Sequence, residues 1–132
     1  MLDKVIDISV EAGLQAEQDL LAAVCAGEFE YGLLLWRPLD RALVMPRRMS
    51  RLAGFEQATE ALAVSGWPIL LRESGGEPVP QSPAVVNIAL VYAQPRGDND
   101  RDRIENAYNR LCQPICDVLI ELGGAASLGE VD

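Results

Sequence analysis

Hydrophobic and polar positions repeat with two different periods along the chain, and the changes of period indicate where helices and strands should lie. Between positions 10 and 26 apolar residues recur at helical spacing, and Gly27 stands where a helix C-terminus is capped. Two runs, 67–71 and 85–92, are almost continuously apolar, as buried strands are. The pattern as a whole predicts helices at 10–26, 55–64 and 103–122, and strands at 4–9, 33–36, 42–45, 67–71 and 85–92.

This mixture of elements predicts an α/β (α+β) fold. We expect one mixed β-sheet built from the strands near Leu33, Ala42, Trp67 and Val85. Helices near Leu14, Phe55 and Leu111 should pack on that sheet. Cys25 falls on the apolar stripe of the first helix and is expected to fill a small space in the core, and Pro114 should kink the last helix.

The stretch between the two apolar runs has the composition of a ligand-binding turn. Arg72 places a positive charge where the strand at 67–71 ends, and Ser74, Gly75 and Gly76 follow. Such a turn can expose successive backbone N–H groups to a phosphate or carboxylate, although an ordinary hairpin or crossover loop has the same composition. Asn87 interrupts the second apolar run, so it needs a hydrogen-bond partner from the backbone or from a ligand.

The composition fits a single folded domain, because 49% of the 132 residues are hydrophobic and the mean hydropathy is +0.09. Eleven basic and 20 acidic residues give a net charge of −9, which argues against nucleic-acid binding. The sequence has no histidine, and its three cysteines lack the paired spacing of a zinc site, so no metal centre is predicted. Without a secretion signal or a membrane-length apolar run, we expect a cytoplasmic protein whose thiols are reduced and at least half-buried.

Two polar clusters allow more than one interpretation. Arg47, Arg48 and Arg51 lie close together in an otherwise acidic chain. They form either a solvated turn that leads into a helix or a contact for phosphate or a partner protein. Residues 95–103 form a polar loop whose acidic residues lack the register of a calcium-binding loop.

The string Arg72-x-Ser74-Gly75-Gly76, followed by a proline-containing loop and an apolar strand with Asn87, resembles the acyl-binding loop of the lipoate–protein ligase family. That family includes the related octanoyl and lipoyl transferases and is structurally kin to biotin protein ligase. Residues 15–21 resemble its opening helix, and residues 33–38 with 42–47 resemble its first hairpin. The resemblance spans most of the chain.

The resemblance implies that ATP and lipoate, or an octanoyl donor, are substrates, and it is compatible with Mg²⁺. An acyl-adenylate would form, and its acyl group would move to a lysine of an acceptor domain. The acceptors would be lipoyl domains of 2-oxoacid dehydrogenases or the glycine cleavage protein. Carried over residue by residue, Arg72 is the anion contact, Ser74, Gly75 and Gly76 surround the acyl-adenylate, and Asn87 lies near the pocket wall.

The sequence departs from the family pattern in the loop and in the catalytic residue. Glu77 stands where ligases often have a third glycine, Gln81 stands where many members have histidine, and residues 82–84 replace a glycine-containing bend. The family's catalytic lysine is absent, because Lys4 is the single lysine and lies far upstream. We therefore expect residues 1–132 to be the N-terminal part of a ligase-like domain without its lysine-bearing strands, and to be inactive alone.

Two classes of function stay open at this point. One is a lipoate–protein ligase or related acyltransferase, and the other is a non-catalytic family member that binds acyl groups, nucleotide or a protein partner. An uncovered sheet edge also predicts a homo-oligomer, because unpaired strand edges invite pairing.

Overall fold

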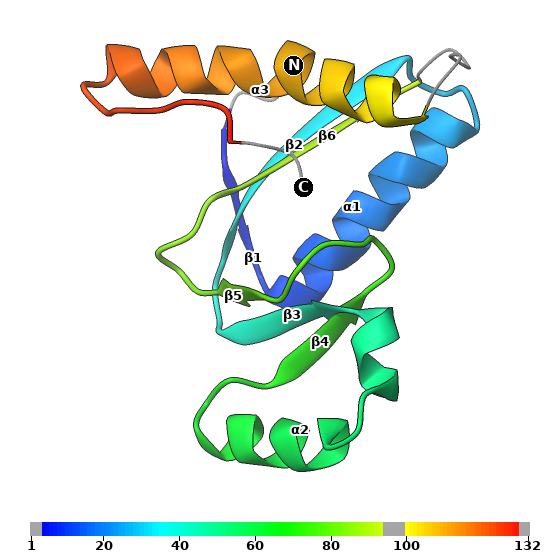
Figure 1. Cartoon of the computed structure of the whole chain (residues 1–132), viewed down its shortest axis with the longest axis vertical. Coiled ribbons are helices and arrows are strands. Elements are labelled where there is room, and N and C mark those ends of the chain that lie inside the picture. Colours follow the sequence, from blue (N-terminus) through cyan, green and yellow to red (C-terminus); the bar gives the residue numbers. More distant parts are fainter. Residues whose placement is uncertain (1–3, 94–99, 130–132) are drawn as a thin grey trace. The chain divides into compact units, whose positions relative to one another are not determined.

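The computed structural model describes residues 4–93 and 100–129, and the chain divides into two compact units, Met1–Ala93 and Gln94–Asp132. Figure 1 shows the elements in colours that follow the sequence. The described part of the first unit contains, in chain order, β1 (Ile6–Ile8), α1 (Val10–Cys25), β2 (Tyr31–Pro38), β3 (Ala42–Pro46), the 3-10 helix η1 (Arg47–Arg51), α2 (Phe55–Val64), β4 (Ile69–Arg72), β5 (Val79–Gln81) and β6 (Asn87–Tyr92). The described part of the second unit contains α3 (Asp100–Glu121).

The strands form two three-stranded mixed sheets, with the orders β1-β2-β6 and β4-β3-β5. This arrangement confirms the predicted α/β (α+β) class and the existence of all five predicted strands. The expectation of a single sheet with a hairpin between 33–36 and 42–45 is wrong. Both edges of β2 are occupied, by β1 in parallel and β6 in antiparallel pairing, and both edges of β3 are occupied by β4 and β5. Strands β2 and β3 therefore belong to different sheets, although they follow one another in the chain.

A short corner at Leu39 and Asp40 carries the chain from one sheet to the other. The backbone N–H of Leu39 donates to the carbonyl of Ile8 at 2.9 Å, which extends the pairing of β2 with β1. The carboxylate of Asp40 accepts from the backbone N–H of Val10 at 2.8 Å, at the N-terminus of α1. An acidic side chain is favourable there, because the first N–H groups of a helix have no partner within the helix.

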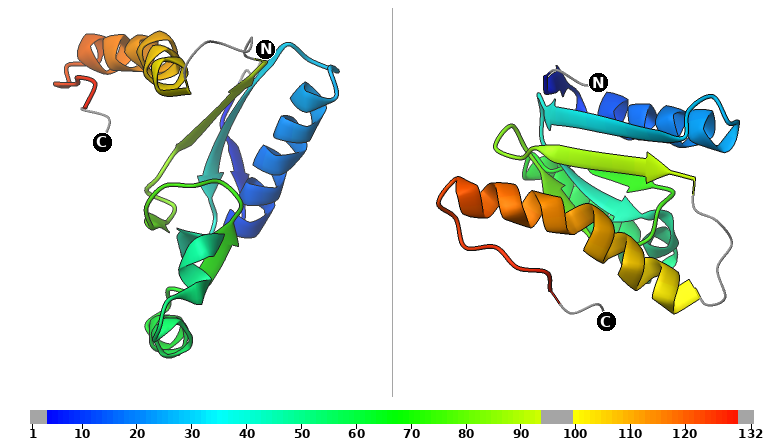
Figure 2. Two further views of the ribbon diagram at one scale, coloured as in Figure 1. Left: turned by 45° about the vertical axis from the view of Figure 1, so that its right-hand side comes forward. Right: turned by 90° about the horizontal axis from the view of Figure 1, so that it is seen from above.

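The core of the first unit joins both sheets to α1. Its buried residues are Val10, Leu34, Trp36, Ala42 and Val44. Helix α1 covers one face of the β1-β2-β6 sheet (Figure 2), and two glycines permit the close approach. A Cβ atom at Gly13 would overlap the ring of Trp36, and one at Gly32 would overlap the end of Leu20.

The bounds of α1 confirm the first predicted helix, but not every apolar residue of its predicted stripe is buried. Val10, Gly13 and Val24 are the buried residues of α1, whereas Leu21 is 44% exposed and Cys25 is exposed. Neighbouring helix positions point about 100° apart, so the step from Val24 to Cys25 turns the thiol out of the core. The expectation that Cys25 fills the core is therefore wrong.

Strand β5 was not expected, because its sequence Val79-Pro80-Gln81 resembles a proline-stiffened loop. It pairs antiparallel with β3, with Leu43 opposite Pro80. Proline has no N–H to donate, but β5 is an edge strand, and an edge position tolerates proline.

The remaining helices also follow the sequence pattern. Helix α2 has the predicted bounds and contacts η1 and β4. Helix α3 begins at Asp100 rather than near Arg103 and contains Pro114, while residues 95–99 of the predicted polar loop lie outside the described residues. Cys112 is half-buried and Cys116 is buried, as predicted. The kink at Pro114 and the packing of α3 on a sheet stay predictions.

Candidate functional site

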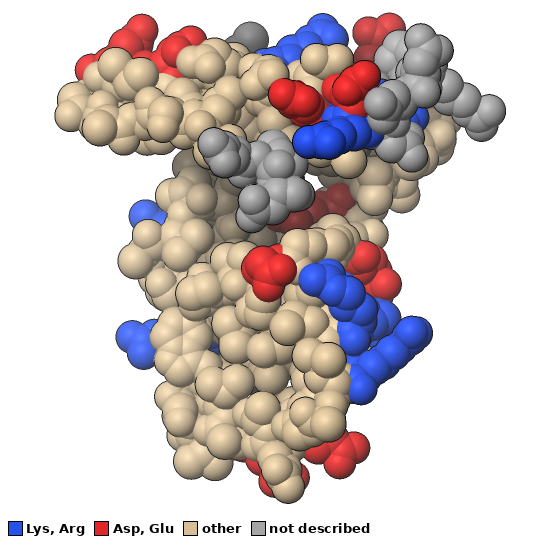
Figure 3. Space-filling model, viewed as in Figure 1, with Lys and Arg blue, Asp and Glu red and all other residues tan. Residues whose placement is uncertain are grey.

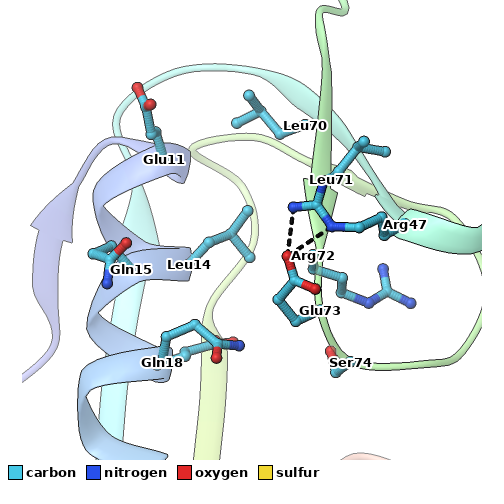
Figure 4. Close-up of a pocket in the computed structure, with 11 residues that line it drawn as sticks. Glu11, Leu14, Gln15, Gln18, Arg47, Leu70, Leu71, Arg72, Glu73 and Ser74 are labelled. Carbon is cyan, nitrogen blue, oxygen red and sulfur yellow. Dashed lines mark hydrogen bonds and ion pairs between the residues drawn. The ribbon is translucent and has the colours of Figure 1, made fainter. Parts of the chain in front are cut away.

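A pocket of about 250 Å³ lies in the first unit between α1 and the end of β4. Figure 4 shows its lining, with Leu14 pointing from α1 toward the β4 side and the side chains of Arg47 and Glu73 joined at the opposite wall. The lining combines apolar, amide and charged groups: Glu11, Leu14, Gln15, Glu17, Gln18, Arg47, Leu70, Leu71, Arg72, Glu73 and Ser74. An apolar chain with a polar or charged head would find both kinds of contact in this pocket.

The guanidinium of Arg72 fixes the glycine loop, residues 72–77, through hydrogen bonds to backbone carbonyls. Its Nη2 donates to the carbonyls of Gly75 and Glu77, both at 2.8 Å, its Nε donates to Gly75 at 3.1 Å, and its Nη1 donates to Val44 at 3.2 Å. A guanidinium carries five N–H groups, so these bonds use four of them. The side chain therefore links β3 to the loop and leaves a single N–H for a ligand.

The two loop glycines have different roles. Gly76 has φ +102°, and a Cβ atom there would lie 2.9 Å from Nη2 of Arg72. A Cβ atom at Gly75 would meet nothing within 4 Å, and its φ lies outside the left-handed region. Only Gly76 is therefore required by the backbone and by the position of the guanidinium.

The loop presents backbone donors that the described part of the protein does not use. None of the N–H groups of residues 74–77 donates to a described residue. Successive free N–H groups in a turn suit an anion, as the sequence pattern predicted for this segment. Ser74 adds a hydroxyl at the pocket wall.

A pair of arginines from η1 braces the other side of the loop. Arg47 Nε donates to Glu73 Oε1 at 2.7 Å, and Arg48 Nη2 donates to the carbonyl of Gly76 at 3.0 Å. Basic side chains gather on this flank of the first unit, beside acidic ones (Figure 3). The hydrogen bond from Arg47 lowers the pKa of Glu73 and raises that of Arg47, so both stay charged over a wider pH range.

Asn87 finds its partner in a side chain rather than in the backbone or a ligand. The amides of Gln81 and Asn87 exchange two hydrogen bonds of 2.8 and 2.9 Å. Gln81 is only 5% exposed, so this exchange satisfies a buried polar group. The pair joins β5 of one sheet to β6 of the other.

The structure thus brings together some of the site residues expected from the sequence. Arg72 and Ser74 line the pocket, and Gly75 and Gly76 complete the loop beside it, whereas Asn87 is not among the lining residues. Sequence reasoning missed Leu14, Gln18 and Glu73 as lining residues. Helical spacing alone could have indicated that Leu14 and Gln18 share a face, because they lie four positions apart.

Glu17 is a further lining residue with a structural bond. Its Oε1 accepts from Trp36 Nε1 at 2.8 Å, and this bond orients the fully buried indole ring. Glu17 therefore connects the pocket wall to the core of the first unit.

The described residues do not group three histidine, cysteine or acidic side chains at one point that could hold a metal ion. They do not fit a resident Mg²⁺ ion, and we derive no step through one. Among the described helices none is long and apolar enough to cross a membrane.

Comparisons with known proteins identify the fold and the family. Residues 9–131 match the model of the lipoyl protein ligase A/B catalytic domain. A solved structure of a candidate lipoate protein ligase from T. acidophilum has a TM-score of 0.63 over 97% of this chain and 52% of its own, at 16% identity, which shows a shared fold.

Two sequence relatives extend the comparison. An uncharacterized protein of Cupriavidus necator is 39% identical over 86% of this chain and 44% of its own length. An octanoyl-[GcvH]:protein N-octanoyltransferase of Kyrpidia tusciae is 43% identical over 52% of this chain and 22% of its own length. The chain thus spans less than half the length of these curated relatives. The match over nearly its whole length shows that the chain belongs to the lipoyl protein ligase A/B catalytic domain family.

Proposed function

We propose that this chain binds a lipoyl- or octanoyl-adenylate as part of the attachment of the acyl group to a lysine of an acceptor protein. The observation that carries the proposal is the loop at 72–77, whose unused N–H groups follow directly on a pocket with apolar and charged walls. Leu14 and Leu70 would contact the acyl chain. Ser74, Gly75 and Gly76 would surround the adenylate, with Arg72 fixing their positions.

The acceptor in this proposal is a lipoyl domain or the glycine cleavage protein. The support for a protein acceptor is the K. tusciae relative, whose name gives octanoyl-GcvH as donor and a protein as acceptor. The two kinds of acceptor are those that the family resemblance implies. ATP would supply the adenylate and bring any Mg²⁺ with it, and the reaction would take place in the cytoplasm.

Acyl transfer needs a side chain that polarises the acyl carboxyl or accepts a proton, and this sequence places no lysine or histidine near the loop. It has no histidine, and its one lysine, Lys4, lies before β1. We propose that these residues act as the N-terminal part of a ligase-like domain and that a lysine outside this sequence polarises the acyl carboxyl. The same observation favours a second candidate, a non-catalytic protein that binds the acyl-adenylate without transferring the acyl group.

Titration calorimetry with a non-hydrolysable octanoyl-adenylate analogue tests the proposal. The chain should bind the analogue, and Arg72→Ala should weaken binding by roughly 1.5–3 kcal/mol, because the loop loses the charge-assisted bonds to Gly75 and Glu77 that fix it. Arg37→Ala is a matched control, because Arg37 also forms an exposed ion pair, with Asp7, but does not line the pocket. Absence of binding by the unmodified chain would refute the proposal.

A transfer assay separates the two candidates. The chain is incubated with ATP, octanoate and the glycine cleavage protein. A longer relative, such as the C. necator protein, is assayed in a separate parallel reaction. Binding without transfer by the chain alone agrees with both candidates, and transfer by the longer relative favours the enzyme. Transfer by these residues alone would contradict the need for an outside lysine.

A further inference from the structure

We propose that Arg47, more than Arg72, binds the anionic group of the acyl ligand, and that Glu73 holds Arg47 in place until the ligand displaces it. This inference rests on the proposed function, since it assigns the cation of the same pocket. The ligand class is a medium-chain acid or its adenylate, recognised through a carboxylate or phosphoryl oxygen.

The two pocket arginines, Arg47 and Arg72, differ in how many guanidinium N–H groups are not already hydrogen-bonded within the protein. Arg72 directs four of its five N–H groups at backbone carbonyls within the loop and β3. Arg47 directs its Nε and one N–H of Nη2 at a single carboxylate oxygen of Glu73. Three N–H groups of Arg47 thus remain for a ligand, against one of Arg72.

Arg47 is also the pocket arginine that can move without disturbing the fold. Its side chain and that of Glu73 are each 58% exposed, and the pair lies at the wall of the pocket (Figure 4). Its backbone is fixed independently, because the hydroxyl of Ser50 donates to the Arg47 carbonyl at 2.8 Å within η1. Exposed ion pairs contribute little to stability, so exchanging one carboxylate for another costs little.

Glu73 occupies the position that a ligand carboxylate would take on Arg47. In the free protein it neutralises a guanidinium that faces a pocket already lined by Glu11 and Glu17. An entering anion would pair with Arg47 and release Glu73 to solvent. The Arg47–Glu73 contact therefore acts as an internal competitor for the ligand.

Competition by Glu73 and simple bracing of the loop predict opposite effects of a Glu73 substitution on ligand affinity. If the ion pair only braces the loop, removing either partner should weaken ligand binding. If Glu73 competes, Arg47→Ala should weaken the binding of octanoate and Glu73→Gln should strengthen it.

The experiment measures the affinity of the whole chain for octanoate, octanamide and AMP by calorimetry. We expect Arg47→Ala to lower octanoate affinity about tenfold, the equivalent of one charge-assisted hydrogen bond, and octanamide affinity less than about threefold. Glu73→Gln should raise octanoate affinity up to about fivefold, as expected for loss of an exposed ion pair. If Arg47→Ala lowers the affinity for AMP as much as that for octanoate, Arg47 contacts a phosphoryl oxygen instead of the carboxylate. Arg47 would still be the residue that binds the anionic group.

Arg37→Ala is again the matched control and should leave all three affinities unchanged. If the unmodified chain binds octanoate but Arg47→Ala affects octanoate and octanamide equally, or Glu73→Gln weakens binding, the inference is wrong and the proposed function stands. If the unmodified chain binds neither octanoate nor the adenylate analogue, the proposed function fails and the inference fails with it. Circular dichroism of each variant separates loss of binding from loss of fold.

Discussion

Arg72 shows how a single residue can serve a binding site without being its main contact. Its guanidinium bonds to the carbonyls of Val44, Gly75 and Glu77, and so fixes the loop whose N–H groups donate to no described residue. The direct anion contact expected of Arg72 stays a prediction for its one remaining N–H. The loop depends on this side chain, and the side chain in turn depends on the absence of a Cβ atom at Gly76.

Substitution of the two loop glycines should therefore have unequal effects. Gly76→Ala places a methyl group against Arg72 Nη2 in a backbone conformation with φ +102°, so it should destabilise the protein by about 1–3 kcal/mol and abolish adenylate binding. Gly75→Ala meets open space and should change stability by less than about 0.5 kcal/mol. Urea unfolding and calorimetry of both variants check this. Equal effects at the two positions would contradict the account of Arg72.

Two exposed ion pairs should make stability depend on pH in the acid range. Hydrogen bonds from Arg37 and Arg47 lower the pKa values of Asp7 and Glu73 below their ordinary 3.8 and 4.5. A lowered folded-state pKa stabilises the protein above the unfolded pKa, and this contribution is lost as the pH falls through the folded pKa. The melting temperature should thus decrease as the pH falls below about 4.5, the ordinary pKa of Glu73, and less so in the double variant Asp7→Asn, Glu73→Gln. An unchanged pH profile in the double variant at low salt would contradict the prediction.

At the level of elements, the position of α1 on β2 is set by two glycines and one indole ring. Gly13 lies against Trp36, whose ring is fully buried and whose Nε1 donates to Glu17. Gly32 lies under the end of Leu20. Because Glu17 also lines the pocket, this packing places the α1 wall of the site.

Gly13→Ala should be more destabilising than Gly32→Ala. The added methyl group at Gly13 meets a rigid buried ring, whereas the one at Gly32 meets the flexible end of a leucine that is only partly buried. Overpacking typically costs about 1–3 kcal/mol, which exceeds the gain of at most about 1 kcal/mol from replacing glycine in a helix. Thermal unfolding of the two variants measures the difference. A Gly13→Ala variant as stable as the parent would show that α1 shifts easily on β2.

Hydrophobic periodicity was sufficient to locate most elements, because it reports local burial. Helix α2 has the bounds that the pattern predicts, and β2, β3, β4 and β6 each overlap a predicted strand. The partition into two sheets could not be read in the same way, because strand pairing depends on contacts between segments far apart in the sequence, such as β2 with β6. Strand β5 was missed because Pro80 is unfavourable in most strands but acceptable at an edge.

The sequence predicted only the part of the candidate site whose residues lie close together in the chain. The glycine loop is a local pattern, so Arg72, Ser74, Gly75 and Gly76 could be selected from the sequence. The contacts made by Glu73 and Asn87 are not local to the loop: Arg47 is 26 residues from Glu73, and the Gln81–Asn87 pair joins two sheets. Only the folded chain shows them.

The whole molecule has the fold of a lipoate protein ligase and belongs to the lipoyl protein ligase A/B catalytic domain family. The chain matches the catalytic-domain model over residues 9–131 but spans 44% and 22% of its curated relatives. Its own residues provide a loop and a pocket, with no lysine or histidine beside them. The loop at 72–77 is therefore the part of the chain that we propose binds the acyl-adenylate.

Amide hydrogen exchange with and without a saturating octanoyl-adenylate analogue tests whether this loop binds the acyl-adenylate. The N–H groups of residues 74–77 have no acceptor among the described residues, so they should exchange fast in the free chain and slow down in the complex. Residues 11–18 of α1, which form the opposite wall, should also slow, while α2, which does not line this pocket, should not change. Unchanged exchange at 74–77 in the presence of the analogue, or slowing confined to other segments, would contradict the account.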